Sequence, residues 1–125
     1  DGADYNDSAI VSTYIAAYHR EDGVGGYLIY EASYDQHSTA YQMLMDNLGN
    51  VSDESASGVL TLYAPSSTTY VKNFSSTLQA VTQNQYSRNT YVAGYINDTT
   101  AIDNISFKMS SGNIDAGTIK MFGVS

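Results

Sequence analysis

Two histidines, His19 and His37, are the side chains best suited to proton transfer or metal ligation near neutral pH. Asp22 follows the first and Asp35 precedes the second, so each ring has a carboxylate nearby in sequence that could orient it. Neither histidine lies in a metal-ligand spacing such as His-x-x-x-His. The spacing therefore favours surface or structural histidines over a catalytic base or a metal site.

Nucleophilic and glycosidic chemistry also lack a recognisable arrangement. No serine lies in a Gly-x-Ser-x-Gly turn, which would expose a catalytic hydroxyl at the end of a strand. No motif selects a pair of carboxylates for glycoside hydrolysis from the three glutamates, Glu21, Glu31 and Glu54. We expect a protein that is not an enzyme and that carries no cofactor.

The N-terminal stretch DGADYND brings together four oxygen-bearing side chains, Asp1, Asp4, Asn6 and Asp7. Oxygen-rich loops of this kind can hold calcium, but the stretch lacks the closing glutamate of the twelve-residue calcium loop. The sequence predicts a solvated acidic loop, with no metal.

Tyrosine is unusually frequent, with 12 copies and no tryptophan. Tyrosine gives a large, rigid contact surface at low entropic cost, and it is also common on half-buried strands. Both interpretations stay open. As possible ligand or subunit contacts the sequence offers Tyr27, Tyr30, Tyr63 and Tyr70.

The overall charge narrows the range of partners. The net charge is −8, and only five residues are Lys or Arg, so a phosphate backbone would be repelled. No apolar stretch is long enough to span a bilayer. We therefore expect neither nucleic acid nor membrane as a partner. Cysteine is absent, so stability must come from packing and assembly.

Residues 1–125 are expected to form one domain, because the composition does not shift along the chain. Polar residues alternate with β-branched and aromatic ones in many short stretches separated by turn signals. This pattern predicts an all-β fold, an antiparallel β-sandwich of about eight strands. The clearest strands are expected at 9–19, 26–34, 58–64, 69–81, 88–96, 101–109 and 117–124. In 38–49 the apolar spacing also allows a short helix.

Five Asn-x-Ser/Thr sequons make a glycosylated extracellular domain an alternative. They begin at Asn6, Asn50, Asn73, Asn97 and Asn104. Two of them fall inside expected strands, and a chain so rich in Ser and Thr produces sequons freely. The sequons alone therefore do not decide the class of protein.

The C-terminal third contains the most specific motif. It has the pattern Thr-Ala-Ile-x-x-Ile, a Gly-Asn-x-x-Ala-Gly turn, and a last strand that ends aromatic-Gly-aliphatic. The matching residues are Thr100, Ala101, Ile102, Ile105, Gly112, Asn113, Ala116, Gly117, Phe122, Gly123 and Val124. This motif resembles the closing segment of jelly-roll domains in virion proteins of tailed bacteriophages. The preceding stretch VLTLYAPSSTTYVKNFSSTLQAV is similar to the strand pair of that family.

The resemblance implies a jelly-roll-like sandwich on the virion, as a capsid decoration or a tail-fibre domain, without catalytic residues. It also implies contacts with other virion proteins and self-association, with a trimer favoured. Compared with the family, residues 1–125 lack one or two N-terminal strands, so we expect them to be part of a longer chain. A receptor-binding module for host surface glycans is an alternative.

Overall fold

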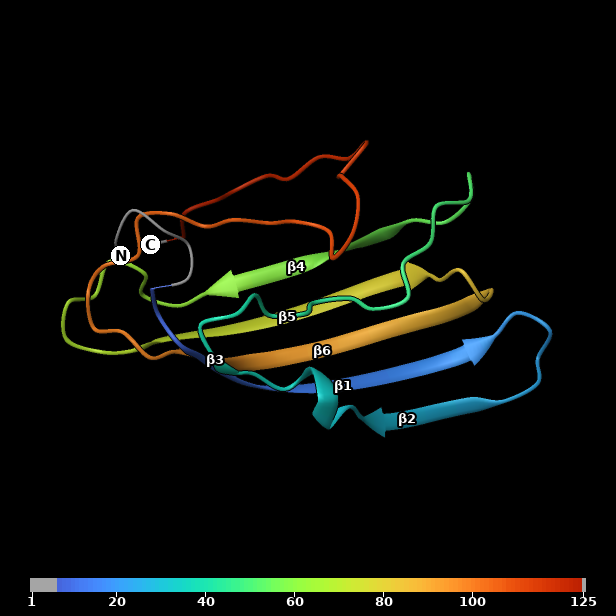
Figure 1. Ribbon diagram of the computed structural model, residues 1–125, viewed down its shortest axis with the longest axis horizontal. Helices are drawn as coiled ribbons and strands as arrows, with labels where there is room; N and C mark the ends of the chain where they lie inside the picture. The colour runs from blue at the N-terminus through green and yellow to red at the C-terminus, as the bar shows by residue number, and fades with distance from the viewer. Residues whose placement is uncertain (1–6, 125) are drawn as a thin grey trace.

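The computed structural model describes residues 7–124, and its regular part is one open antiparallel sheet (Figure 1). The strands are β1 (Ile10–Arg20), β2 (Gly26–Tyr30), β3 (His37–Ser38), β4 (Ala56–Leu62), β5 (Lys72–Val81) and β6 (Tyr86–Ile96). Their order across the sheet is β2-β1-β6-β5-β4, and β3 pairs with the beginning of β1. In this part of the chain the helical structure is one 3₁₀ turn, Ala32–Tyr34, so the all-β prediction is confirmed.

One face of the sheet, here called the inner face, carries the core. The even-numbered residues of β1, β5 and β6 point to this face, and the buried apolar cluster consists of Tyr14, Ala16, Phe74 and Val92. Alternation with a period of two produces this arrangement, because successive side chains of a strand point to opposite faces. The inner face positions the cavities described below.

Two irregular segments cover the inner face in place of a second sheet. Residues 39–48 pack Met43 and Leu44 against the core, and residues 101–110 lie over Leu60 and Leu62 of β4. In Figure 1 the orange trace after β6 runs along the β4 side of the sheet without forming a strand. No helix in residues 7–124 is long and apolar enough to cross a membrane.

The expected strands at 101–109 and 117–124 are wrong, and the described residues show neither a sandwich nor a jelly roll. The alternation in both segments is real, but strand formation also needs a neighbour that accepts and donates backbone hydrogen bonds. Residues 101–110 lean on the inner face without pairing, and residues 110–124 are exposed throughout. Six strands therefore form where about eight were expected.

The second expected strand, 26–34, ends early at Tyr30. Its continuation is blocked at Tyr14 of β1, whose N–H donates to the Asp35 carboxylate at 2.9 Å instead of to a strand carbonyl. Pairing resumes at Ser12, whose N–H donates to the Gln36 carbonyl at 3.1 Å. The predicted strand is thus reduced to β2 and the 3₁₀ turn, and the short β3 forms beyond its predicted end. The short helix considered for 38–49 does not form either.

The opposite, outer face of the sheet lies open to solvent. A continuous lateral row runs across all five long strands in register, namely Tyr30, Ile15, Tyr91, Thr77 and Val59. Every member of this row is exposed. A half-solvated antiparallel sheet usually places polar residues on such a face. This exposed row of mainly apolar and aromatic side chains departs from that pattern.

Candidate functional site

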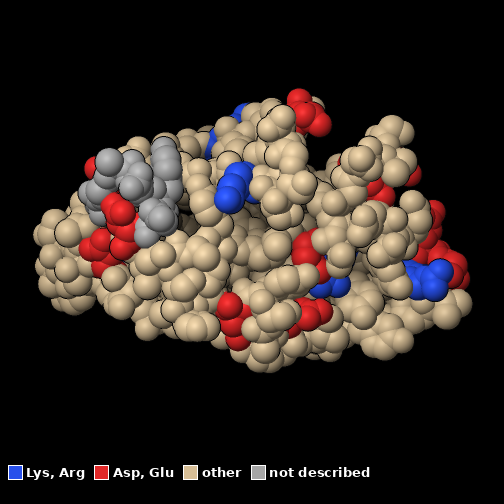
Figure 2. Space-filling view, in the orientation of Figure 1, with Lys and Arg blue, Asp and Glu red and all other residues tan. Residues whose placement is uncertain are grey.

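A large cavity lies between the inner face and its two covering segments. Its volume is about 850 Å³, within the range of about 300–1,000 Å³ typical of small-molecule sites. The wall on the side of the sheet is apolar and includes Ile10, Leu60, Leu62, Phe74, Leu78 and Ile96. Figure 2 shows a hollow on this face, surrounded mainly by uncharged side chains.

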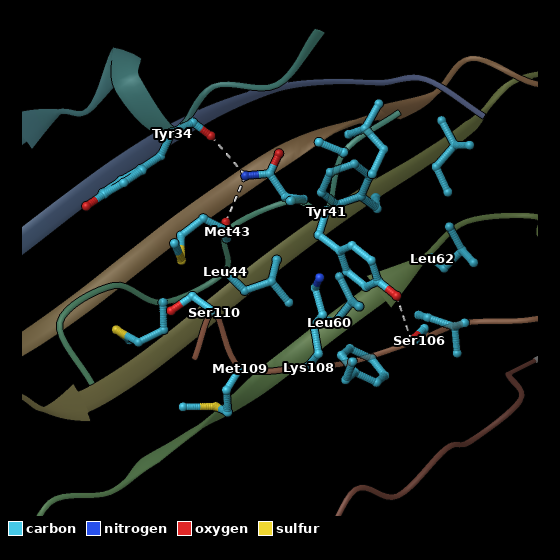
Figure 3. A pocket seen from close by; sticks show the side chains of 18 of the residues that line it. Tyr34, Tyr41, Met43, Leu44, Leu60, Leu62, Ser106, Lys108, Met109 and Ser110 are labelled. Atoms are coloured by element: carbon cyan, nitrogen blue, oxygen red, sulfur yellow. Dashed lines mark hydrogen bonds between the residues drawn. The ribbon is translucent and has the colours of Figure 1, made fainter. Parts of the chain in front are cut away.

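Tyr41 and Lys108 join the two covering segments at the mouth of this cavity (Figure 3). The Tyr41 hydroxyl donates to the Ser106 Oγ at 3.0 Å. The Lys108 Nζ lies 4.2 Å from the centre of the Tyr41 ring, a cation–π contact. Both contacts are at the surface, so they hold the cover only weakly.

A buried polar cluster fixes one of the covering segments, residues 39–48, to the sheet. The Asp46 Oδ1 accepts hydrogen bonds from the Arg88 Nε at 2.7 Å and from the Tyr14 hydroxyl at 2.6 Å. Asp46 and Arg88 are both buried. Burial, followed by the hydrogen bond to Asp46, raises the pKa of Tyr14 above its ordinary value of 10. The three groups hold residues 39–48 against β1 and β6.

A second buried cation, Lys72 of β5, anchors the start of the C-terminal segment. Its side chain is fully buried, and its Nζ donates to the backbone carbonyls of Asp98, at 3.1 Å, and Thr100. The Asp98 carboxylate accepts from the Ser8 hydroxyl and from the Thr100 N–H, both at 2.6 Å. These bonds, that of Ser8 foremost, hold the pKa of Asp98 well below its usual range. The turn after β6 is thus structurally fixed.

Beyond this turn, residues 110–124 form a segment that we call the C-terminal arm. Every residue of the arm is exposed, including large apolar side chains: Met121 is 88% exposed, Phe122 79% and Val124 96%. Isolated exposed apolar residues are ordinary, whereas a contiguous run of them marks an interaction surface. The arm is therefore a candidate contact region.

The structure does not bring the four predicted tyrosines to one place. All four are exposed, by 52–72%. Tyr27 packs beside Tyr18 on the inner side of β2, with ring centres 5.2 Å apart, and Tyr70 lies in the loop before β5. Tyr30 and Tyr63 share the outer face but lie at opposite edges of the sheet, separated by about 19 Å in the direction across the strands and further offset along them. One ligand therefore cannot contact all four.

The predicted histidines and glutamates do not converge on one site either. His19 lies at one end of β1, and His37 pairs opposite Val11, about 27 Å away along the strand. Glu54 accepts from the Val51 N–H, Glu31 faces Arg88, and Glu21 lies in the turn after β1. Residues 7–124 contain no group of His, Asp and Glu placed to hold a metal ion.

The predicted acidic loop and the first sequon fall partly or wholly outside the residues that the structure describes. Asp1, Asp4 and Asn6 lie outside the described residues, and Asp7 is exposed. The asparagines of the other four sequons, Asn50, Asn73, Asn97 and Asn104, are all exposed.

Sequence reasoning missed Arg88, Asp46 and Lys72, the residues around which the polar contacts of the inner face are organised. One signal was available for two of them. The chain has only five basic residues, and Lys72 and Arg88 both fall inside expected strands, where a charge on the core face must find a partner. Asp46 gave no such signal, because it lies in an irregular segment.

A scan against protein-family models and searches of curated proteins and of solved structures found no match to this chain.

Proposed function

We propose that the chain is a non-enzymatic structural domain of a tailed-phage virion, displayed on the capsid or the tail, that assembles with copies of itself and with other virion proteins. The observation that carries the proposal is the C-terminal arm, whose apolar side chains have no cover in the described structure. The motif in residues 100–124 supports the virion location by resemblance. Nucleic acid and membrane are not expected as partners.

The arm and the large cavity are complementary in chemistry. Residues 118–124 carry Ile119, Met121, Phe122 and one charge, Lys120. The cavity is mainly apolar, and its charged lining residues are three acids, Asp7, Asp46 and Asp103, and one lysine, Lys108. An arm donated by a neighbouring copy would bury its apolar residues there and add its positive charge to an acidic rim.

Arm exchange would also extend the sheet at one of its edges. The outer edge of β4 has unpaired backbone groups, and such edges accept an added strand. Residues 117–124 have the alternation of a strand and would pair with this edge in the assembly. We propose that arms paired in this way hold neighbouring copies together, in an oligomer for which a trimer is favoured, so that their sheets can pack face to face as a jelly-roll-like sandwich.

Light scattering coupled to size-exclusion chromatography tests the proposal on the full chain. We expect an oligomer that the double substitution Met121→Glu with Phe122→Glu converts to a monomer, whose circular dichroism spectrum should retain the signal of the six-stranded sheet. The matched control is Val24→Glu with Val51→Glu, which charges two exposed apolar residues in loops outside the arm. A monomeric wild type, or an arm variant with the mass of the wild type, would contradict the proposal.

The virion location has its own experiment. Antibodies raised against residues 7–124 should label intact particles of the source phage in electron microscopy, on the capsid or on the tail. Absence of the chain from purified particles would exclude this location.

The second candidate is a glycosylated extracellular domain. It is favoured by the four sequon asparagines in residues 7–124, which are all exposed. Mass spectrometry of native material tests it. Glycans on Asn50 and Asn97 would favour this candidate, and unmodified asparagines would remove its support.

A further inference from the structure

A second, smaller cavity surrounds the guanidinium group of Arg88. Arg88 is 5% exposed and uses its Nε to bind Asp46. Its buried Nη2 has no hydrogen-bond acceptor within the described structure, and the Glu31 Oε1 lies 3.8 Å away, too far for a hydrogen bond. Buried guanidinium donors are normally satisfied, so this open donor calls for an acceptor from outside the chain.

The volume of the cavity and the side chains that line it suit one small polar molecule. Its volume is about 250 Å³, just below the lower bound of about 300 Å³ for drug-sized ligands. The wall combines aromatic rings with hydrogen-bonding side chains, and besides Arg88 and Ile29 it consists of Tyr18, Tyr34, Tyr86, Glu31, Asp46, Asn47, Thr82 and Asn84. The rings of Tyr18 and Tyr86 meet edge to face with centres 5.3 Å apart, and so form one rigid side.

The charges of the wall select the class of ligand. Arg88 contributes one positive charge against the two carboxylates of Asp46 and Glu31, so the cavity is net negative and disfavours an anion. A cationic group such as an ammonium cannot accept the hydrogen bond that the Arg88 Nη2 has to donate. A neutral hydroxyl group suits both side chains, because its oxygen accepts a hydrogen bond from the Arg88 Nη2 and its proton is donated to the Glu31 carboxylate.

We propose that this cavity binds a neutral, hydroxyl-rich molecule the size of one sugar ring, either free or as one unit of a glycan. The apolar face of such a ring would pack against the aromatic side of the cavity beside Tyr86, while the Arg88 Cζ lies over the Tyr18 ring at 5.2 Å. The hydroxyls of the ring would reach Arg88, Glu31 and Asn84. The site lies apart from the arm and does not depend on self-association.

Titration of the full-length protein, followed by amide NMR, tests the proposal with glucose, galactose, mannose and N-acetylglucosamine as probes. At least one of these neutral sugars should shift the resonances of residues 46–47 and 84–88, whereas inorganic phosphate and sialic acid should not. The proposal would be overturned if phosphate or sialic acid bound more tightly than every neutral sugar. It would also be overturned if no sugar shifted the resonances of these residues at millimolar concentration.

Two variants tie such binding to the cavity. Asn84→Ala alters an exposed turn residue, so the melting temperature should stay constant while the affinity falls about tenfold, as expected for one lost hydrogen bond in a ligand site. The matched control, Asn73→Ala, truncates an exposed asparagine on the outer face and should leave binding unchanged. Glu31→Gln keeps the shape of the cavity wall and should lower the affinity for the sugar. Unchanged affinity in both Asn84→Ala and Glu31→Gln would place the sugar elsewhere and refute the proposal.

Discussion

At the scale of single residues, the hydroxyl of Tyr14 is expected to contribute strongly to stability. It donates to the buried, charged Asp46 at 2.6 Å, and hydrogen bonds to charged groups contribute about 1.5–3 kcal/mol. Tyr14→Phe should therefore lower the free energy of unfolding by about 2 kcal/mol, measured by urea denaturation. Tyr30→Phe is the control, because the bond from Tyr30 to Asp35 lies at the surface and its loss should change stability little. Equal effects of the two substitutions would contradict the assigned role of Asp46.

Gly94 of β6 is a second residue whose substitution has a sharp expected outcome. A Cβ at this position would lie 2.2 Å from the carbonyl oxygen of Val11 and 2.8 Å from the Cα of Ser12, both on the neighbouring strand. Backbone atoms cannot move aside cheaply, so Gly94→Ala should destabilise the sheet by about 3 kcal/mol. Thermal unfolding measures the loss. Gly123→Ala, where a Cβ meets no atom within 4 Å, should leave the melting temperature unchanged.

At the scale of elements, the turn between β6 and the C-terminal segment should be sensitive to acid. The pKa of Asp98 is lowered in the folded protein, chiefly by the bond from Ser8 and then by those from Thr100. A lowered pKa means that the ionised form favours folding, so this contribution is complete above the ordinary carboxyl value of 3.8 and declines as the pH falls below it.

Asp98→Asn tests this dependence by unfolding at a series of pH values. The variant should be less stable than the wild type at neutral pH, and the difference should shrink as the pH falls below about 4. Asp115→Asn, in the exposed arm, should show no such convergence. A difference that stayed constant down to strong acid would mean that the ionised Asp98 does not stabilise the turn.

The elements also show what sequence could predict. The alternation in 9–19 and 88–96 identified β1 and β6 nearly to the residue, because a half-buried strand leaves a period of two. The same period in 101–109 and 117–124 was misleading, since pairing depends on a partner edge that local sequence does not encode. The cavity at Arg88 was likewise beyond reach, because it forms only when residues 46–47 fold back across β6.

At the scale of the whole molecule, self-association must overcome the charge of the chain. Each copy carries a net charge of −8, so bringing copies together is opposed by long-range repulsion, while burial of the arm depends little on salt. Raising the ionic strength from about 0.01 to about 0.15 M shortens the Debye length from about 30 to about 8 Å, which screens this repulsion. The oligomer should therefore become tighter with added salt, as measured by sedimentation equilibrium. Dissociation by salt would instead mean that contacts such as Lys120 with the acidic rim dominate the interface, and that the apolar side chains of the arm are not its main source of affinity.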